Sequence, residues 1–141
     1  MAYCRCGKRL LRGHRCKACL HKIEGLEVKK SNIEGAGLGL FATKEIPKNR
    51  TISEYTGTYK PNFYKGDRKY AIYNSVFDCI LDADKCYHGA ARYANDARGS
   101  GKQNNAALVE DPKGKICLIS KKKILPDTEI LTSYGNHYWN T

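Results

Sequence analysis

The sequence lacks any long uncharged apolar run, and this absence excludes a transmembrane helix, which needs about 20 consecutive apolar residues. The N-terminus, Met1-Ala2-Tyr3-Cys4-Arg5, lacks the apolar core of a secretory signal. No internal repeat is present, and convincing helical character is confined to a turn at residues 88–93. These absences predict a soluble intracellular protein of the cytoplasm or the nucleus, with little helix.

Acidic residues are scarce relative to basic ones. Lys and Arg number 25 against 14 Asp and Glu, so the formal net charge is +11. Such an excess is typical of proteins that contact polyanions, most often nucleic acid, although it also serves general solubility. With 141 residues, the chain is long enough for one ordinary domain and a small appendage.

Cysteines are concentrated at the N-terminus, where four of the seven lie within the first nineteen residues. In an intracellular protein such a cluster indicates metal ligands rather than disulfides. Two close pairs separated by a short loop suit tetrahedral zinc, and four protein ligands would make the site structural. The expected ligands are Cys4, Cys6, Cys16 and Cys19.

A segment as small as residues 1–24 cannot bury a core of its own, so bound zinc would explain how it folds. His14 or His21 could replace one thiolate, and free thiols on a disordered arm are the alternative. The basic residues between the cysteines suit phosphate contact, or they form a solvated face. We expect a separate Cys-rich, zinc-binding segment at 1–24 and a second domain at 25–141.

Short β segments alternate with turn residues from position 26 onward, which predicts a mainly β fold. Glu110-Asp111-Pro112-Lys113-Gly114-Lys115 has the composition of a hairpin turn, and Gly57 is expected at a close approach between strands. A turn at 125–127 precedes the last strand. The expected strands are 26–29, 39–43, 51–57, 70–73, 77–82, 106–109 and 116–120.

Three motifs carry the chemistry. The first, Gly35-Ala36-Gly37-Leu38-Gly39, could be an ordinary turn, and the strand expected after it argues against a dinucleotide fingerprint. Its use would be close approach of the backbone to a ligand. The second is Arg92-Tyr93-Ala94-Asn95-Asp96. The third, residues 129–135, reads as a strand that ends in Tyr134 and Gly135.

The order and spacing of these motifs, with Leu81-Asp82-Ala83 ahead of the second, resemble the SET-domain protein lysine methyltransferases over residues 25–139. The resemblance implies a β-fold of several small sheets with a C-terminal pseudoknot. In that pseudoknot the strand near the C-terminus passes beneath the Asn95 segment and brings Asn95 close to Tyr134.

The resemblance also implies transfer of methyl groups from S-adenosylmethionine to lysine side chains of proteins, and histone tails are the expected substrate in chromatin. Tyr134 would be the catalytic phenol, and Tyr55 and Tyr73 would line the lysine channel, with simple core packing as the alternative for each tyrosine. Trp139 would stack on adenine or cap the core. The implied cofactor-binding residues are Ala36, Gly37, Leu38, Tyr70, Asn95, Asp96 and Trp139.

The chain departs from the family pattern in two places. Asp96 replaces the usual His, and no cysteine cluster follows Tyr134, so residues 137–139 or a partner subunit would close the cofactor site. The brevity and the Y-G-x-x-Y-W ending are similar to a compact viral type of SET protein, which implies a homodimer, in a host cell if the protein is viral. The alternative is a zinc-containing nucleic-acid or chromatin-binding module whose SET-like domain is inactive, which the Asp96 change could allow.

Overall fold

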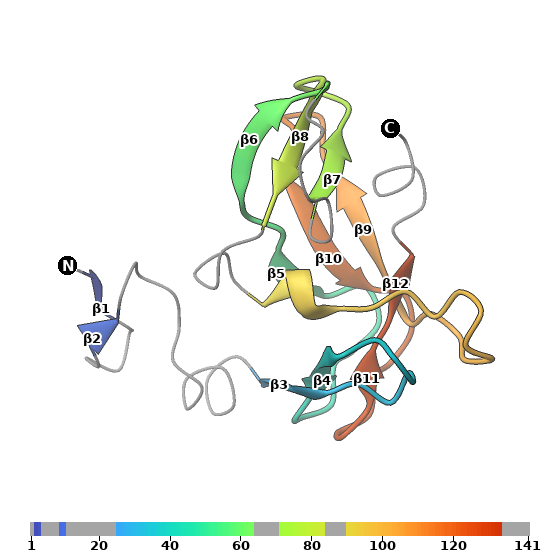
Figure 1. The fold of residues 1–141 in the computed structure, drawn as a ribbon. Helices are drawn as coiled ribbons and strands as arrows, with labels where there is room; N and C mark the ends of the chain where they lie inside the picture. The colour runs from blue at the N-terminus through green and yellow to red at the C-terminus, as the bar shows by residue number, and fades with distance from the viewer. Residues whose placement is uncertain (1, 4–8, 11–24, 64–70, 84–89, 134–141) are drawn as a thin grey trace.

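Strands make up nearly all the regular structure of the computed structural model (Figure 1), which describes residues 2–3, 9–10, 25–63, 71–83 and 90–133. A short 3-10 turn, η2 (Ala91–Tyr93), is the only helical element in these ranges. The strands are β1 (Ala2–Tyr3), β2 (Arg9–Leu10), β3 (Leu26–Lys30), β4 (Leu38–Ala42), β5 (Thr51–Glu54), β6 (Thr58–Pro61), β7 (Ala71–Asn74), β8 (Cys79–Asp82), β9 (Ala106–Glu110), β10 (Ile116–Ser120), β11 (Glu129–Ile130) and β12 (Thr132–Ser133). The predicted mainly β fold is confirmed.

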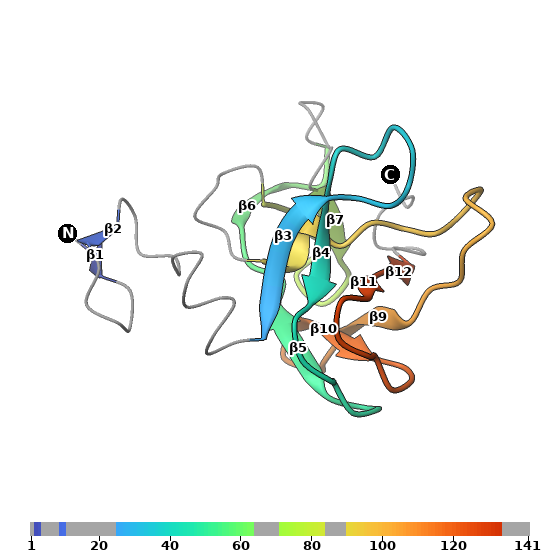
Figure 2. The same ribbon diagram turned by 90° about the horizontal axis from the view of Figure 1, so that it is seen from below.

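The strands from β3 onward form three small sheets, with strand orders β12-β9-β10-β5, β11-β4-β3 and β6-β8-β7 (Figures 1 and 2). All pairings within them are antiparallel except that of β12 with β9. A single apolar core joins the three sheets, and burial of that surface is the main favourable contribution to their packing. Its fully buried aliphatic members include Leu26, Leu40, Ile72, Ile116, Leu118, Ile124 and Ile130.

The hairpin predicted at residues 106–120 is present, with β9 and β10 paired from Ala106↔Ser120 to Glu110↔Ile116. Asp111 shapes its turn, because one carboxylate oxygen accepts from the backbone N–H groups of Lys113 and Lys115, each at 2.9 Å. Gly114 has a φ of +87°, a conformation that glycine adopts without strain. The turn composition therefore predicted the hairpin correctly.

Strand β6 was not predicted from the sequence, and it ends at Pro61, which cannot donate a hydrogen bond to a sheet. In the structure β6 lies at the edge of its sheet and pairs only with β8 among the described strands, so the proline is tolerated there. The strand expected at 51–57 ends at Glu54. Of the helical turn expected at 88–93, residues 91–93 are helical and 84–89 lie outside the described residues.

The division into segments 1–24 and 25–141 remains a prediction, because residues 2–3 and 9–10 are all that the structure describes of the first segment. Those four residues pair as an antiparallel ladder between β1 and β2. Within the described ranges, no helix has the length and apolar composition needed to cross a membrane.

Gly57 is a site of close approach, as expected. A Cβ atom at this position would lie 2.5 Å from the backbone carbonyl oxygen of Asp82. Real side chains do not approach a backbone atom so closely, and a carbonyl fixed in the β6–β8 ladder cannot retreat without breaking the pairing of Thr58 with Asp82.

We therefore predict that Gly57→Ala lowers the free energy of unfolding by about 2–3 kcal/mol, because the added methyl group overpacks the site. Gly101→Ala is the matched control. Gly101 has a φ of +78° and open space around it, so the control adds strain of about 1 kcal/mol without a clash. Urea denaturation monitored by circular dichroism measures both. Equal losses in the two variants would contradict the close-approach explanation.

Candidate functional site

The glycine-rich loop between β3 and β4 is closed by its own backbone. The N–H of Ser31 donates to the carbonyl of Gly37 at 2.8 Å, and the N–H of Ala36 donates to the carbonyl of Ile33 at 3.1 Å. Gly35 and Gly37 both have positive φ, and a Cβ at either position would meet no atom within 4 Å. The loop is thus internally braced and open on the outside, as backbone that receives a ligand must be.

Asn95 connects this loop to residues 129–133, which contain β11 and β12 and which we call the closing strand. Its amide Nδ2 donates to the carbonyl of Leu38 at 2.9 Å, and its own backbone carbonyl accepts from the N–H of Thr132 at 2.8 Å. A parallel bridge also pairs Asn95 with Leu131. The structure therefore brings the second motif beside the first and beside the chain just before Tyr134, as the pseudoknot requires.

Glu129 forms the centre of the contact between these segments. Its carboxylate accepts from the Ser31 hydroxyl at 2.6 Å, from the Asn32 N–H at 2.8 Å and from Asn95 Nδ2 at 3.4 Å. Glu129 is 5% exposed, so the three donors compensate the loss of water around a charged group. Because Asn95 Nδ2 donates to both Leu38 and Glu129, the amide oxygen Oδ1 remains to accept a hydrogen bond from a ligand.

Asn105 fixes the closing strand from the other side. Its buried side chain donates to the carbonyl of Glu129 at 2.9 Å and accepts from the N–H of Leu131 at 2.9 Å. The backbone N–H of Asn105 also donates to the carbonyl of Leu131 at 2.9 Å. A single amide thus bonds the backbone on both sides of Ile130, where the chain passes from β11 towards β12.

The side chain of Asp96 serves the loop that follows it. One carboxylate oxygen accepts from the Arg98 N–H at 2.9 Å and from Asn104 Nδ2 at 3.4 Å. Asn104 in turn accepts from the N–H of Ala97 at 2.9 Å. The side chain of Asp96 therefore joins the two ends of loop 97–104. The backbone of Asp96 continues directly from Asn95.

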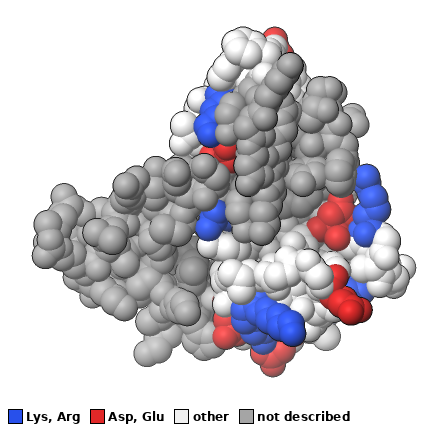
Figure 3. All heavy atoms as spheres, viewed as in Figure 1, with Lys and Arg blue, Asp and Glu red and all other residues white. Residues whose placement is uncertain are grey.

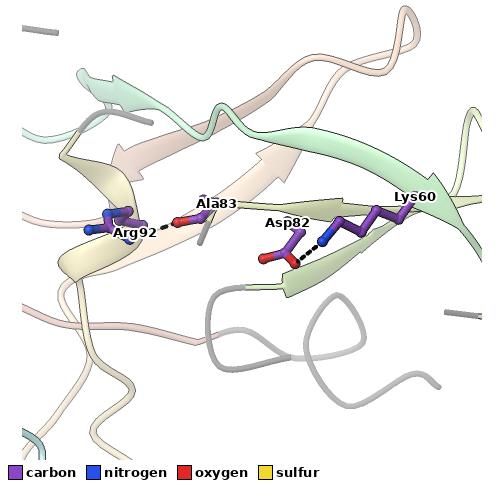
Figure 4. A network of polar contacts seen from close by, with 4 residues as sticks. All are labelled: Lys60, Asp82, Ala83 and Arg92. Carbon is purple, nitrogen blue, oxygen red and sulfur yellow. Dashed lines mark hydrogen bonds and ion pairs between the residues drawn. The ribbon is translucent and has the colours of Figure 1, made fainter. Parts of the chain in front are cut away.

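Behind η2, the buried side chain of Arg92 holds the turn against the residue that follows β8 (Figure 4). Arg92 Nη1 donates to the carbonyl of Ala83 at 2.8 Å, and its guanidinium lies 4.4 Å from the ring centroid of Tyr93. One residue earlier on β8, the buried carboxylate of Asp82 pairs with Lys60 Nζ from β6 at 3.0 Å. The hydrogen bond from Arg92 to Ala83 anchors the turn that presents Asn95, while the ion pair of Lys60 with Asp82 joins β6 to β8.

The two predicted channel tyrosines occupy different surroundings. Tyr55 is 2% exposed and lies in the central core, with its N–H donating to the carbonyl of Ile116 at 2.8 Å. Tyr73 is half-buried on β7, and its hydroxyl donates to the carboxylate of Asp78 at 2.6 Å. This hydrogen bond raises the pKa of Tyr73 and lowers that of Asp78. Their placement in a lysine channel remains a prediction.

Of the predicted cofactor-binding residues, Leu38 and Asn95 touch directly, and Ala36, Gly37 and Asp96 adjoin them in the chain. Leu38 is 52% exposed at the start of the central strand β4. Tyr70, Tyr134 and Trp139 lie outside the described residues, as do Cys4, Cys6, Cys16 and Cys19. Within the described part of the chain, no three His, Cys, Asp or Glu side chains gather as a metal site would need.

A fold of small β-sheets in which an asparagine segment, a glycine-rich loop and a C-terminal strand converge defines the SET class of proteins. The sequence itself matches the SET domain family over residues 37–135, and the chain belongs to that family. Among curated proteins, none matches the sequence significantly.

Solved structures share the fold. The methyltransferase domain of human PR domain-containing protein 2 is 24% identical, with a TM-score of 0.64 over 84% of this chain and 82% of that one. ctPRC2 in an autoinhibited conformation bound to S-adenosylmethionine is 22% identical, with a TM-score of 0.66 over 82% of this chain and 16% of that one. KRYPTONITE in complex with mCHH DNA, H3(1-15) peptide and SAH is 20% identical, with a TM-score of 0.60 over 78% and 23%. The chain therefore spans less than a quarter of the latter two.

Sequence reasoning missed Ser31 and Asn105 as residues of the site. It also missed the role of Glu129 as a buried hydrogen-bond acceptor. Ser31 and Glu129 are 98 positions apart, so no local pattern connects them. The sequence feature that could have indicated the buried Glu129 carboxylate was Gly39. A Cβ there would lie 2.4 Å from Glu129 Oε2, so a side chain at this third glycine of the motif would displace the carboxylate.

We predict that the buried contact between Ser31 and Glu129 gives a coupling free energy of about 1–2 kcal/mol in a double-mutant cycle with Ser31→Ala and Glu129→Gln. The cycle would be measured by urea denaturation. Ser53→Ala is the control, because the Ser53 hydroxyl lies 3.4 Å from the carbonyl of Glu54, and it is expected to change the free energy of unfolding by less than about 0.5 kcal/mol. Additive losses in the cycle would show that the contact contributes nothing specific.

Proposed function

We propose that the protein is an S-adenosylmethionine-dependent protein-lysine N-methyltransferase. The observation that carries the proposal is the position of Asn95, whose side chain and backbone join the glycine-rich loop to the strand that leads into Tyr134. Membership of the SET domain family and the methyltransferase named in one similar structure support it.

The described residues fit S-adenosylmethionine in two ways. The methionine part of that molecule carries an ammonium group, which needs hydrogen-bond acceptors, and Asn95 Oδ1 is such an acceptor. The exposed side chain of Leu38 offers an apolar surface to a bound molecule. The open backbone at Ala36 and Gly37 lets that molecule pack closely against the loop. When bound, the cofactor supplies a methyl group on a positively charged sulfur.

The protein would contribute alignment and control of the lysine proton. A free lysine amine has a pKa of about 10.4, so it must lose a proton before it attacks a methyl carbon. A dry channel beside a positive charge disfavours the ammonium form. Tyr134 would orient the neutral amine, while Tyr55 and Tyr73 would enclose its aliphatic stem, and Tyr70 and Trp139 would complete the cofactor site. Most of the rate enhancement would come from this alignment.

Histone tails are the proposed substrate, and the nucleus or the cytoplasm the proposed location. A KRYPTONITE structure of the same fold holds an H3(1-15) peptide together with DNA. A protein with a net charge of +11 has no electrostatic advantage in binding a basic tail, so we propose that its charge serves contact with nucleic acid beside the substrate. A homodimer remains part of the proposal, because a partner subunit could complete the cofactor site.

We predict that Tyr134→Phe lowers the rate of methyl transfer to a histone and ribosomal protein panel by at least about 100-fold, because the orienting hydroxyl is lost. Transfer of a labelled methyl group, resolved by mass spectrometry, measures it. Tyr59→Phe makes the same chemical change on an exposed residue of β6 and is expected to retain full activity. A wild-type protein that binds no cofactor and labels no substrate would instead support an inactive SET-like module that binds chromatin.

We also propose structural zinc in segment 1–24, held by Cys4, Cys6, Cys16 and Cys19. The donor set of four thiolates is one that zinc favours. One zinc per chain is the expected content by elemental mass spectrometry, and Cys16→Ser with Cys19→Ser is expected to abolish it. Cys79→Ser with Cys117→Ser removes the two free cysteines that the structure describes in segment 25–141 and is expected to leave the zinc in place. The same zinc loss in both double variants would rule out the N-terminal site.

A further inference from the structure

Two turns far apart in the sequence lie side by side below the β11-β4-β3 sheet (Figures 1 and 2). One connects β4 to β5 over residues 43–50, and the other follows β10 over residues 120–127. An antiparallel bridge joins them, in which Ile46 and Ile124 exchange backbone hydrogen bonds of 2.8 Å in both directions. Ile124 is buried, so the bridge is also anchored in the core.

Ser120 fixes the second contact between the turns. Its hydroxyl accepts from the N–H of Arg50 at 2.9 Å and donates to the carbonyl of Pro47 at 2.6 Å. The backbone N–H of Ser120 donates to the carbonyl of Arg50, and its carbonyl accepts from the N–H of Asn49, each at 2.9 Å. Because these groups are satisfied by one another, the two turns form a single rigid element.

This element, which we call the basic double turn, has six exposed basic side chains against two acidic ones, Glu45 and Asp127. None of the six makes an ion pair with any residue that the structure describes, whereas Lys29, Lys60 and Lys115 each pair with a carboxylate. On the face drawn in Figure 3, basic and acidic side chains are interspersed. The six residues are Lys44, Lys48, Arg50, Lys121, Lys122 and Lys123.

We infer that the basic double turn binds the phosphate backbone of a nucleic acid. Six positively charged side chains on two braced turns suit a polyphosphate. Each phosphate that they neutralise releases counterions, and these favourable contributions to the binding free energy accumulate along the strand. Backbone-rigid turns also lose little conformational entropy when they bind. The inference rests on the nucleic-acid contact proposed above and is independent of methyl transfer.

The basic double turn lies at the far end of β4 from the glycine-rich loop. The turn at 43–50 follows Ala42, at the opposite end of β4 from Leu38, and four strand steps separate these residues by about 13 Å. A nucleic acid bound at the double turn would therefore contact the opposite end of β4 from the glycine-rich loop.

Salt-dependent binding of the full-length protein tests the inference. Fluorescence anisotropy with a 20-base-pair DNA duplex, and in a second arm with RNA of the same length, gives the slope of log K against log salt. Two double variants each remove two positive charges from the basic double turn. One is Lys121→Gln with Lys123→Gln, and the other is Lys48→Gln with Arg50→Gln. Each is expected to lower the slope for DNA by about 2, because each lost phosphate contact removes about 1. The arm with the higher affinity shows whether the basic double turn prefers the phosphates of DNA or of RNA.

The matched control is Lys113→Gln with Lys115→Gln, which removes the same charge at the other end of β10. It is expected to leave the slope unchanged. An equal fall in slope in this control would overturn the inference, as would polyglutamate that displaces the labelled DNA as well as unlabelled DNA does. Intact nucleic-acid binding by a protein without methyltransferase activity would refute the enzyme proposal and leave this one standing. All variants alter exposed side chains, and unchanged thermal unfolding confirms that they fold.

Discussion

The carboxylate of Glu129 is the group on which the arrangement of the site depends. It is buried and ionisable, so it is tolerated only where hydrogen-bond donors surround it. Those donors come from Ser31 and Asn32 before the glycine-rich loop, and from Asn95 after η2. The need to satisfy one charged group therefore holds three distant segments in a single geometry, and this geometry sets where a ligand of the loop can lie.

The same constraint explains why the three glycines of the motif serve two different physical purposes. Gly35 and Gly37 have positive φ and open surroundings, so glycine there serves the shape of the backbone. Gly39 has no such φ, but any side chain would collide with Glu129 Oε2. A substitution at the first two positions would alter the loop, whereas one at the third would displace the carboxylate and with it the contacts to Ser31 and Asn95.

Local features could be predicted from the sequence, and long-range ones could not. The hairpin at 106–120 was predictable because Asp111 and Gly114 mark its turn, and Gly57 was recognisable as a close approach. Strand β6 was not, because Pro61 is acceptable only at an edge and the sequence does not show which strands are edges. Asn105 lies in a polar run that reads as loop, yet its amide is buried against β11. The family resemblance correctly implied the contact of Asn95 with the closing strand, and the roles of Tyr134, Tyr55 and Tyr73 still rest on that resemblance.

The replacement of the usual family histidine by Asp96 can be judged from its contacts. The Asp96 carboxylate accepts from Arg98 and Asn104 and so folds loop 97–104. Asn95 keeps its hydrogen bonds to Leu38 and Thr132 beside it, so the change leaves the joined segments as they are. An inactive SET-like module would be expected where such a change broke this junction. The substitution of Asp96 therefore leaves the contacts of Asn95 with the glycine-rich loop and with Thr132 in place.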